Sequence, residues 1–211
     1  KGLLKAAHFG PTLIVTAISF GFGTYYWWEG PAYVIAFGVF TGQLVVGWSN
    51  DLYDFDDDLK HQRAKKPLVS GLITKQYLQK WLRFMVPFSF VANLLGPLGI
   101  KGGSVYMLGI AFGVAYNFYF KFSILSPLPY AIAFAALPSS VALSKEINPP
   151  MWMLLGGALF GMAAHFINVI KDMDQDQASG IKGLPQRLGK VKSIAVAVVL
   201  IALGIALLIV S

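Results

Sequence analysis

Seven apolar runs, each close to the length of a membrane crossing, follow one another along the chain. They fall at about 9–28, 32–50, 78–97, 104–120, 125–145, 150–170 and 191–210. A transmembrane helix needs about 20 predominantly apolar residues. Helix-breaking residues mark the expected joints, at Gly30-Pro31, Gly102-Gly103, Pro127 with Pro129, and Pro149-Pro150. The pattern predicts an all-α, polytopic transmembrane bundle of about seven helices.

Polar residues interrupt this pattern most sharply after the second run. Five of the eight aspartates lie there, at Asp51, Asp54, Asp56, Asp57 and Asp58. An ionised carboxylate at membrane depth costs roughly 2.5–3.5 kcal/mol, so such a cluster indicates a functional site. If the helix continues through it, Asn50, Asp54 and Asp58 share one face, because residues four apart are neighbours on a helix. Three oxygen-bearing side chains would then point in one direction.

The other three aspartates repeat this cluster. An offset of 118 residues relates Asn50, Asp54, Asp56, Asp58, Pro67 and Gly71 to Asn168, Asp172, Asp174, Asp176, Pro185 and Gly189. Repeated halves around a shared central site are common in membrane proteins. We therefore expect one membrane domain, 1–211, built from two pseudo-repeats of four helices around a central cavity, with repeat one at about 1–120 and repeat two at about 121–211.

The sequence also leads to an expectation about each end of the chain. The Lys-Gly-Leu-Leu-Lys start resembles a trimmed chain and not a signal peptide. The counterpart of the fourth helix would fall beyond Ser211, so the second repeat is expected to lack one or two C-terminal helices.

Composition agrees with a membrane protein. Hydrophobic residues make up 56% of the chain and charged residues 13%, against about 25% charged in soluble domains. The absence of cysteine excludes disulfides and thiolate metal sites.

Basic residues are divided unequally between the two sides. If successive helices cross the membrane in alternating directions, only Lys101 and Lys145 fall on one side, and the other fifteen lysines and arginines fall on the opposite side. Both acidic clusters lie on the side with the fifteen basic residues. Because basic loops favour the cytoplasm, the site is expected to face it. Membrane topology explains the net charge of +7 without nucleic acid. The aromatic run Tyr25 to Trp28 would lie at the opposite interface.

The paired acids predict a magnesium–diphosphate site. Carboxylates four residues apart offer oxygen ligands for Mg²⁺, which prefers to share its coordination with substrate phosphates. Basic residues near the clusters are candidates for the phosphate oxygens that the metal leaves free: Arg63, Lys66, Lys121, Lys171, Lys182 and Arg187. Metal-bound diphosphate is a good leaving group, since its developing charge is stabilised. The expected substrate has a diphosphate head and a lipophilic tail.

Several motifs resemble those of the UbiA superfamily of intramembrane prenyltransferases. They are N-D-x-x-D-x-x-x-D at Asn50 to Asp58, a basic-Pro-Leu-x-x-Gly segment at Lys66 to Gly71, D-x-x-x-D at Asp172 to Asp176 followed by Gly180 and Leu184-Pro185, and Tyr-Asn-x-Tyr-x-Lys at Tyr116 to Lys121. The resemblance covers essentially the whole chain. Lys66 stands where many members have arginine, which changes bidentate recognition into a point charge.

The resemblance implies Mg²⁺-dependent transfer of an isoprenyl group from an isoprenyl diphosphate to an aromatic or other lipophilic acceptor within the membrane. It assigns two magnesium ions to Asn50, Asp54, Asp58, Asp172 and Asp176, of which the four aspartates are the candidate catalytic residues. Further substrate-binding candidates are Asn50, Asp51, Arg63, Lys66, Tyr116, Lys121, Asn168, Lys171 and Lys182.

Other functions remain open at this point. A membrane terpene cyclase on the same scaffold would need no acceptor, and a lipid or isoprenoid transporter would leave the diphosphate intact. At the residue scale, His165 either reaches the site or is an ordinary buried histidine, while Tyr116 and Tyr119 either stabilise a cation or simply pack. His8 and His61 carry no functional signal.

Overall fold

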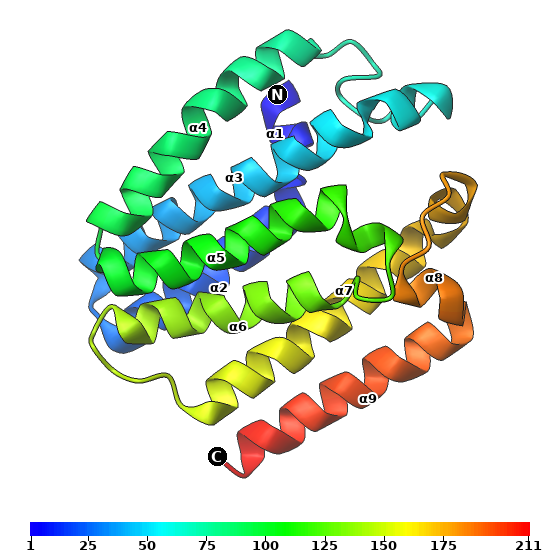
Figure 1. Ribbon diagram of the computed structural model, residues 1–211. Helices are drawn as coiled ribbons and strands as arrows, with labels where there is room; N and C mark the ends of the chain where they lie inside the picture. Colours follow the sequence, from blue (N-terminus) through cyan, green and yellow to red (C-terminus); the bar gives the residue numbers. More distant parts are fainter.

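The computed structural model describes residues 1–211, and all of its regular secondary structure is helical (Figure 1). Seven long helices are α2 (Phe9–Tyr26), α3 (Glu29–Lys60), α4 (Lys75–Leu95), α5 (Gly99–Phe118), α6 (Leu128–Leu143), α7 (Met151–Ala178) and α9 (Lys190–Ile209). Three short elements are α1 (Gly2–Ala6), the 3-10 turn η1 (Phe120–Phe122) and α8 (Leu184–Leu188). The all-α bundle expected from the apolar runs is confirmed, with one long helix for each run.

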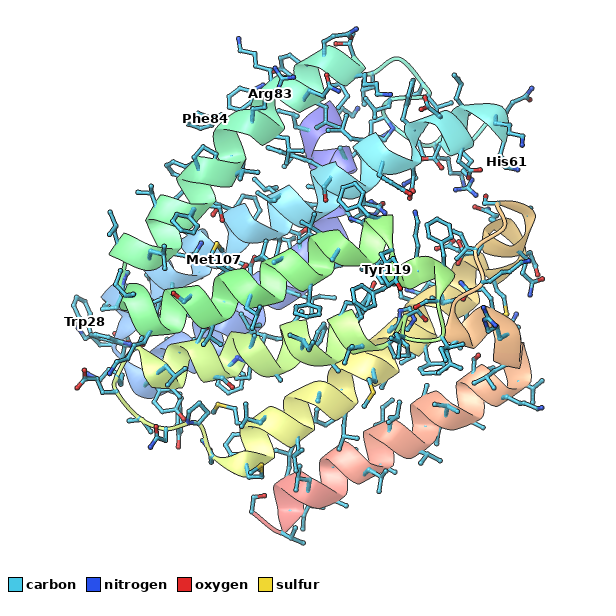
Figure 2. All side chains as sticks on the ribbon, viewed as in Figure 1. Trp28, His61, Arg83, Phe84, Met107 and Tyr119 are labelled. Carbon is cyan, nitrogen blue, oxygen red and sulfur yellow. The ribbon has the colours of Figure 1, made fainter.

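The helices pack side by side in an order that brings the ends of α3 and α7 to one end of the bundle. Neighbouring pairs are α4 with α3, α3 with α5, α5 with α6, α6 with α7, and α7 with α9, while α2 packs on α3 and α6. Figure 1 shows the C-terminal ends of α3 and α7 on the same side of the bundle, with α8 next to the end of α7. In Figure 2, His61 and Tyr119 lie towards this end and Trp28 at the opposite one. We call the His61 side the polar end.

The packed interior lies mainly between α3, α4, α5 and α6. Its most enclosed side chains include Ile35, Val39, Leu78 and Val141. The Tyr106 hydroxyl donates to the Val39 carbonyl at 2.8 Å, which satisfies a polar group inside an otherwise apolar core. Elsewhere the helices are apolar on their outer faces as well, and α9 exposes Val198, Val199 and Leu203. By length and composition, α3, α7 and α9 each qualify as a membrane-crossing helix.

One expected joint is wrong. Gly102 and Gly103 lie inside α5, and the chain turns instead at Gly96-Pro97, between α4 and α5. A Cβ at Gly102 would lie 2.3 Å from the Ser140 carbonyl oxygen, and one at Gly103 would lie 2.4 Å from that of Asn93. These glycines therefore let α5 approach α6 and α4 closely, which sequence alone does not distinguish from a break.

Two apolar hollows lie between helices. The first, of about 380 Å³, lies between α3, α4 and α5 and includes Val45, Pro87 and Met107 in its lining. The second, of about 390 Å³, lies between α2 and α7 beside Tyr25 and Trp152. Neither is lined by an acidic residue. The central cavity expected beside the acids stays a prediction.

Candidate functional site

The first acidic cluster is carried by an unbroken helix. Since α3 runs on to Lys60, Asn50, Asp54 and Asp58 follow one another along one face, as the four-residue spacing predicts. The Asn50 amide donates to Asp54 Oδ2 at 3.0 Å and to Asn117 Oδ1 of α5 at 3.1 Å. A single amide thus connects the acidic face of α3 to the end of α5.

Basic side chains from outside α3 pair with its carboxylates. Lys66 Nζ lies 2.8 Å from Asp51 Oδ1, and Arg63 Nη1 lies 2.7 Å from Asp58 Oδ1. Lys121 lies in η1, just after α5, and forms an ion pair with the carboxylate of Asp54, which is 67 residues away in sequence. Asp51, Asp58 and Lys121 are almost completely buried, so each charge needs the partner that the fold supplies.

Lys66 is a partly buried cation in the connection between α3 and α4. Its burial alone would lower the pKa of its ammonium group, but the adjacent Asp51 carboxylate, together with Asp58, outweighs burial and raises it. Lys66 therefore stays protonated at neutral pH and is held beside the carboxylates as a permanent positive charge.

The second cluster, at the end of α7, is more open. Asn168, Lys171 and Asp172 are exposed, and Asp176 is half-buried. The Gln186 amide of α8 donates to Asp176 Oδ2 at 2.8 Å. Lys171 and Lys182 form no ion pair with an acidic side chain in the folded chain, so their ammonium groups are free for an anion.

Arg63 joins the two clusters. Besides Asp58, its guanidinium donates to Ser179 Oγ at 2.7 Å and reaches the Gln175 carbonyl oxygen at 3.5 Å, both at the end of α7. Lys121, which pairs with Asp54, is also close enough to interact electrostatically with Asp176. The structure therefore brings together acids that lie more than 100 residues apart in sequence.

Two polar residues at this end were missed by sequence reasoning. His8, judged to carry no signal, lies 3.1 Å through Nε2 from Asn50 Oδ1 and 3.3 Å from Asp51 Oδ1. Gln186 holds Asp176 as described. No local sequence pattern predicts either contact. His8 and Asn50 are 42 residues apart, and they meet only because α1 and α2 pack on α3.

An aromatic group borders the site on the inner side. His165 is fully buried, and its ring packs 4.8 Å from that of Tyr130 and 5.5 Å from that of Tyr116, measured between centroids. Tyr116 lies within electrostatic range of both Asp54 and Asp176. Of the two alternatives for His165, the structure therefore shows the buried histidine. Tyr119, by contrast, points outwards and is 65% exposed.

The donor set suits a hard divalent cation. It consists of carboxylate and amide oxygens, the ligand type that Mg²⁺ prefers. Asp51 Oδ2 is buried without a hydrogen-bond partner, so at least one oxygen has unused ligand capacity. No three acidic or histidine side chains converge into a ready-made cation site. A metal here would thus share its coordination with a ligand, as the sequence analysis expects of a diphosphate site.

Comparison with known proteins identifies the class. The family model of the UbiA prenyltransferase family matches residues 9–211. The chain therefore belongs to the UbiA prenyltransferase family: it is an integral membrane protein of helical bundle fold and an enzyme of the prenyltransferase class. No curated protein matches its sequence significantly.

Solved structures share this fold at low sequence identity. A UbiA homolog from Archaeoglobus fulgidus bound to GPP and Mg²⁺ superposes with a TM-score of 0.79 at 17% identity, covering 98% of this chain and 76% of that one. The same homolog bound to DMAPP and Mg²⁺ gives the same values. A structure described as digeranylgeranylglyceryl phosphate synthase has a TM-score of 0.69 at 20% identity, covering 98% and 75%.

Proposed function

We propose that this protein transfers an isoprenyl group from an isoprenyl diphosphate to an aromatic or other lipophilic acceptor within the membrane, in the presence of two magnesium ions. The observation that carries the proposal is the pairing of three acids with three bases at the polar end: Asp51 with Lys66, Asp54 with Lys121, and Asp58 with Arg63. Such pairs suit a metal-bound diphosphate, because the carboxylates can bind the metal ions and the basic groups can bind the phosphate oxygens.

Asn50, Asp54, Asp58, Asp172 and Asp176 would hold the metal ions. When bound there, the metal ions would supply positive charge to offset the negative charge that develops on the departing diphosphate. The ammonium and guanidinium groups of Lys66, Lys121 and Arg63 are already placed beside these carboxylates, and they would bind the phosphate oxygens. Lys171 and Lys182 add free positive charge from the second cluster, and Asn168 and Asp51 add polar contacts.

The other residues of the site serve the prenyl group. Tyr116 packs against Tyr130 and His165 on the inner side of the site, where the negative face of its ring can stabilise the allylic cation that forms as the C–O bond breaks. The apolar helices around it exclude water and accept the isoprenyl tail. The acceptor attacks the cation and loses a proton, which balances the reaction.

We also make proposals about the orientation of the protein in the membrane and about its domain organisation. We propose that the polar end faces the cytoplasm, because nearly all basic residues of the chain lie towards it. We also propose that residues 1–211 form one membrane domain of two repeats, since α3 and α7 are both long helices that carry an Asn-x-x-x-Asp-x-x-x-Asp pattern at the same end of the bundle.

The relatives support this substrate class. Two of the solved structures of similar fold hold GPP or DMAPP together with Mg²⁺. Both are small isoprenyl diphosphates, and the acids with their basic partners in this chain suit the head group that they share.

The deciding experiment measures pyrophosphate release. Purified protein in lipid is incubated with Mg²⁺ and geranyl, farnesyl or geranylgeranyl diphosphate, with and without phenolic or lipid-alcohol acceptors. Release that depends on Mg²⁺ and on an acceptor supports the proposal. A cyclic hydrocarbon or alcohol formed without an acceptor would identify a terpene cyclase instead. Bound but intact diphosphate under all conditions would point to a transporter and reject the transferase.

A further inference from the structure

A single buried hydroxyl joins three segments beside the site. Ser126, 1% exposed, lies in the connection between η1 and α6. Its Oγ accepts the Leu184 backbone N–H at 3.0 Å and lies 3.0 Å from His165 Nε2. Ser126 therefore ties the connection that carries Lys121 both to α7 and to the start of α8.

His165 gives this junction a rigid base. Its ring is fully buried and packs against the rings of Tyr116 and Tyr130, which also contact each other. A side chain packed on several sides has little rotamer freedom left, so the hydrogen bond to His165 holds the Ser126 hydroxyl in one orientation. Leu184 is consequently held at a fixed place relative to α5, α6 and α7.

The segment around Leu184 fits against Ser126 without spare room. A Cβ at Gly183 would lie 2.8 Å from Ser126 Oγ, 2.7 Å from Gln186 Oε1 and 3.1 Å from the Lys121 carbonyl oxygen. Gln186, three residues further on, donates to Asp176 Oδ2. The close packing around Gly183 therefore brings together the backbone of Lys121, which pairs with Asp54, and the side chain of Gln186, which holds Asp176.

We propose that Ser126 is a positioning residue for the isoprenyl transfer described above, on which this inference rests. By fastening residues 179–189 to the Lys121 connection, it sets the spacing between the Asp54 and Asp176 clusters before substrate arrives. It acts through Leu184, Gln186 and Lys121 and does not touch the substrate. Nothing in the local sequence around Ser126 indicates this role.

The proposal makes a specific kinetic prediction. Without the hydroxyl, residues 179–189 lose their side-chain hydrogen bond to the connection that carries Lys121, and substrate binding must order them at the expense of affinity. Once substrate is bound, the same acids and bases surround the diphosphate, so the chemical step changes little. Loss of Ser126 should therefore raise KM far more than it lowers kcat.

The test compares Ser126→Ala with Ser123→Ala in full-length protein in lipid. Ser123 is a matched control in the same connection: its Oγ also accepts a backbone N–H, but only from Leu125, two residues away. With Mg²⁺ and geranyl diphosphate, Ser126→Ala should raise KM about tenfold, the usual scale for a lost buried hydrogen bond, and keep kcat within about twofold. Ser123→Ala should match the wild type.

Limited trypsin digestion provides a readout that needs no activity. Lys182 and Arg187 are exposed at the two sides of Leu184, and cleavage there should be faster in Ser126→Ala than in the wild type. Gly183→Ala should have the same effect by displacing the segment sterically, with Gly21→Ala as a control because nothing lies within 4 Å of its Cβ position. Gly183→Ala also replaces Ser126→Ala if the latter fails to fold.

The outcomes separate the two proposals. Equal trypsin rates and equal KM in wild type, Ser126→Ala and Gly183→Ala would overturn the positioning role. A lower kcat with an unchanged KM in Ser126→Ala would overturn it as well. If instead the wild-type protein releases no pyrophosphate, the proposed function fails, while the digestion rates still decide whether Ser126 fastens the segment.

Discussion

At the residue scale, Asp54 connects α3 to the segment that follows α5. It accepts a hydrogen bond from Asn50 on its own helix and pairs with Lys121 after α5. Its neighbour Asp56 points away, with a side chain 84% exposed and a single loose contact to Lys75. The two aspartates thus form a natural pair for testing whether position or mere charge matters.

Asp54→Ala should reduce pyrophosphate release about a hundredfold or more, the range found when one electrostatic contact to a transition state is removed. Asp172→Ala should do the same in the second cluster. Asp56→Ala serves as the control and should retain nearly full activity. The rates are measured with Mg²⁺ and geranyl diphosphate, after confirming equal expression and folding. Full activity in Asp54→Ala would remove that residue from the site.

Lys66→Met should destabilise the folded protein by about 3 kcal/mol, because it leaves the buried Asp51 carboxylate without its closest cation. The control is Lys65→Met, since Lys65 is exposed and pairs with no acid. Unfolding is followed by heat or denaturant in detergent. A loss no greater than that of the control would show that Asp51 is satisfied without Lys66.

The same pair predicts a pH dependence with a definite sign. Burial by itself lowers the pKa of Lys66, yet Asp51 raises it above the ordinary value of 10.5. A cation with a raised pKa stabilises the fold at all pH values below its unfolded value and loses this effect only as pH rises through the folded value. The stability difference between wild type and Lys66→Met should therefore be constant from pH 7 to about 9 and shrink above the ordinary value. A difference that declines between pH 7 and 9 would contradict this.

Sequence reasoning at this scale succeeded where the signal was local. The four-residue spacing of Asn50, Asp54 and Asp58 predicts a shared helical face, and α3 provides it. The contacts of His8, Ser126 and Gln186 are not local, since their partners lie 10 to 58 residues away. No spacing rule can reveal them, and only the packing of the helices does.

At the scale of elements, the helices extend further into the polar segments than hydropathy suggests. The second apolar run ends at about residue 50, but α3 continues to Lys60, and α7 likewise continues to Ala178. The added turns carry the acids. Hydropathy identifies only the part of a helix that lies in lipid. The helix itself can continue beyond that part, because its backbone groups still bond to one another while the polar side chains bind partners or water.

Gly103 provides a test of helix packing. Gly103→Ala would place a Cβ 2.4 Å from the Asn93 carbonyl oxygen, and we expect a loss of about 1–3 kcal/mol from overpacking between α5 and α4. Gly21→Ala, in open surroundings, should be neutral or stabilising by up to about 1 kcal/mol, because alanine favours the helix. Thermal unfolding in detergent compares the two. Equal effects would mean that α5 and α4 are less closely packed than the structure shows.

At the scale of the whole molecule, both acidic clusters and most basic residues gather at one end. Because the chain contains no cysteine, single-cysteine variants report topology without background. Lys65→Cys and Lys182→Cys should be protected from a membrane-impermeant maleimide in intact cells and react after permeabilisation. Lys101→Cys should react in intact cells. Labelling of Lys65→Cys and Lys182→Cys from opposite sides would separate the two clusters and exclude a shared site.

The amino-acid sequence by itself determined the class of this protein. Long apolar runs must form helices in lipid, because backbone groups there have no water to bond with, and acids repeated at helical spacing must share a face. The tertiary structure alone decided which partners those acids meet. Lys121 reaches Asp54 and Gln186 reaches Asp176 through helix packing and segment connections, and Arg63 reaches Ser179 at the end of α7 in the same way. Such contacts depend on three-dimensional proximity, which the order of residues along the chain does not express.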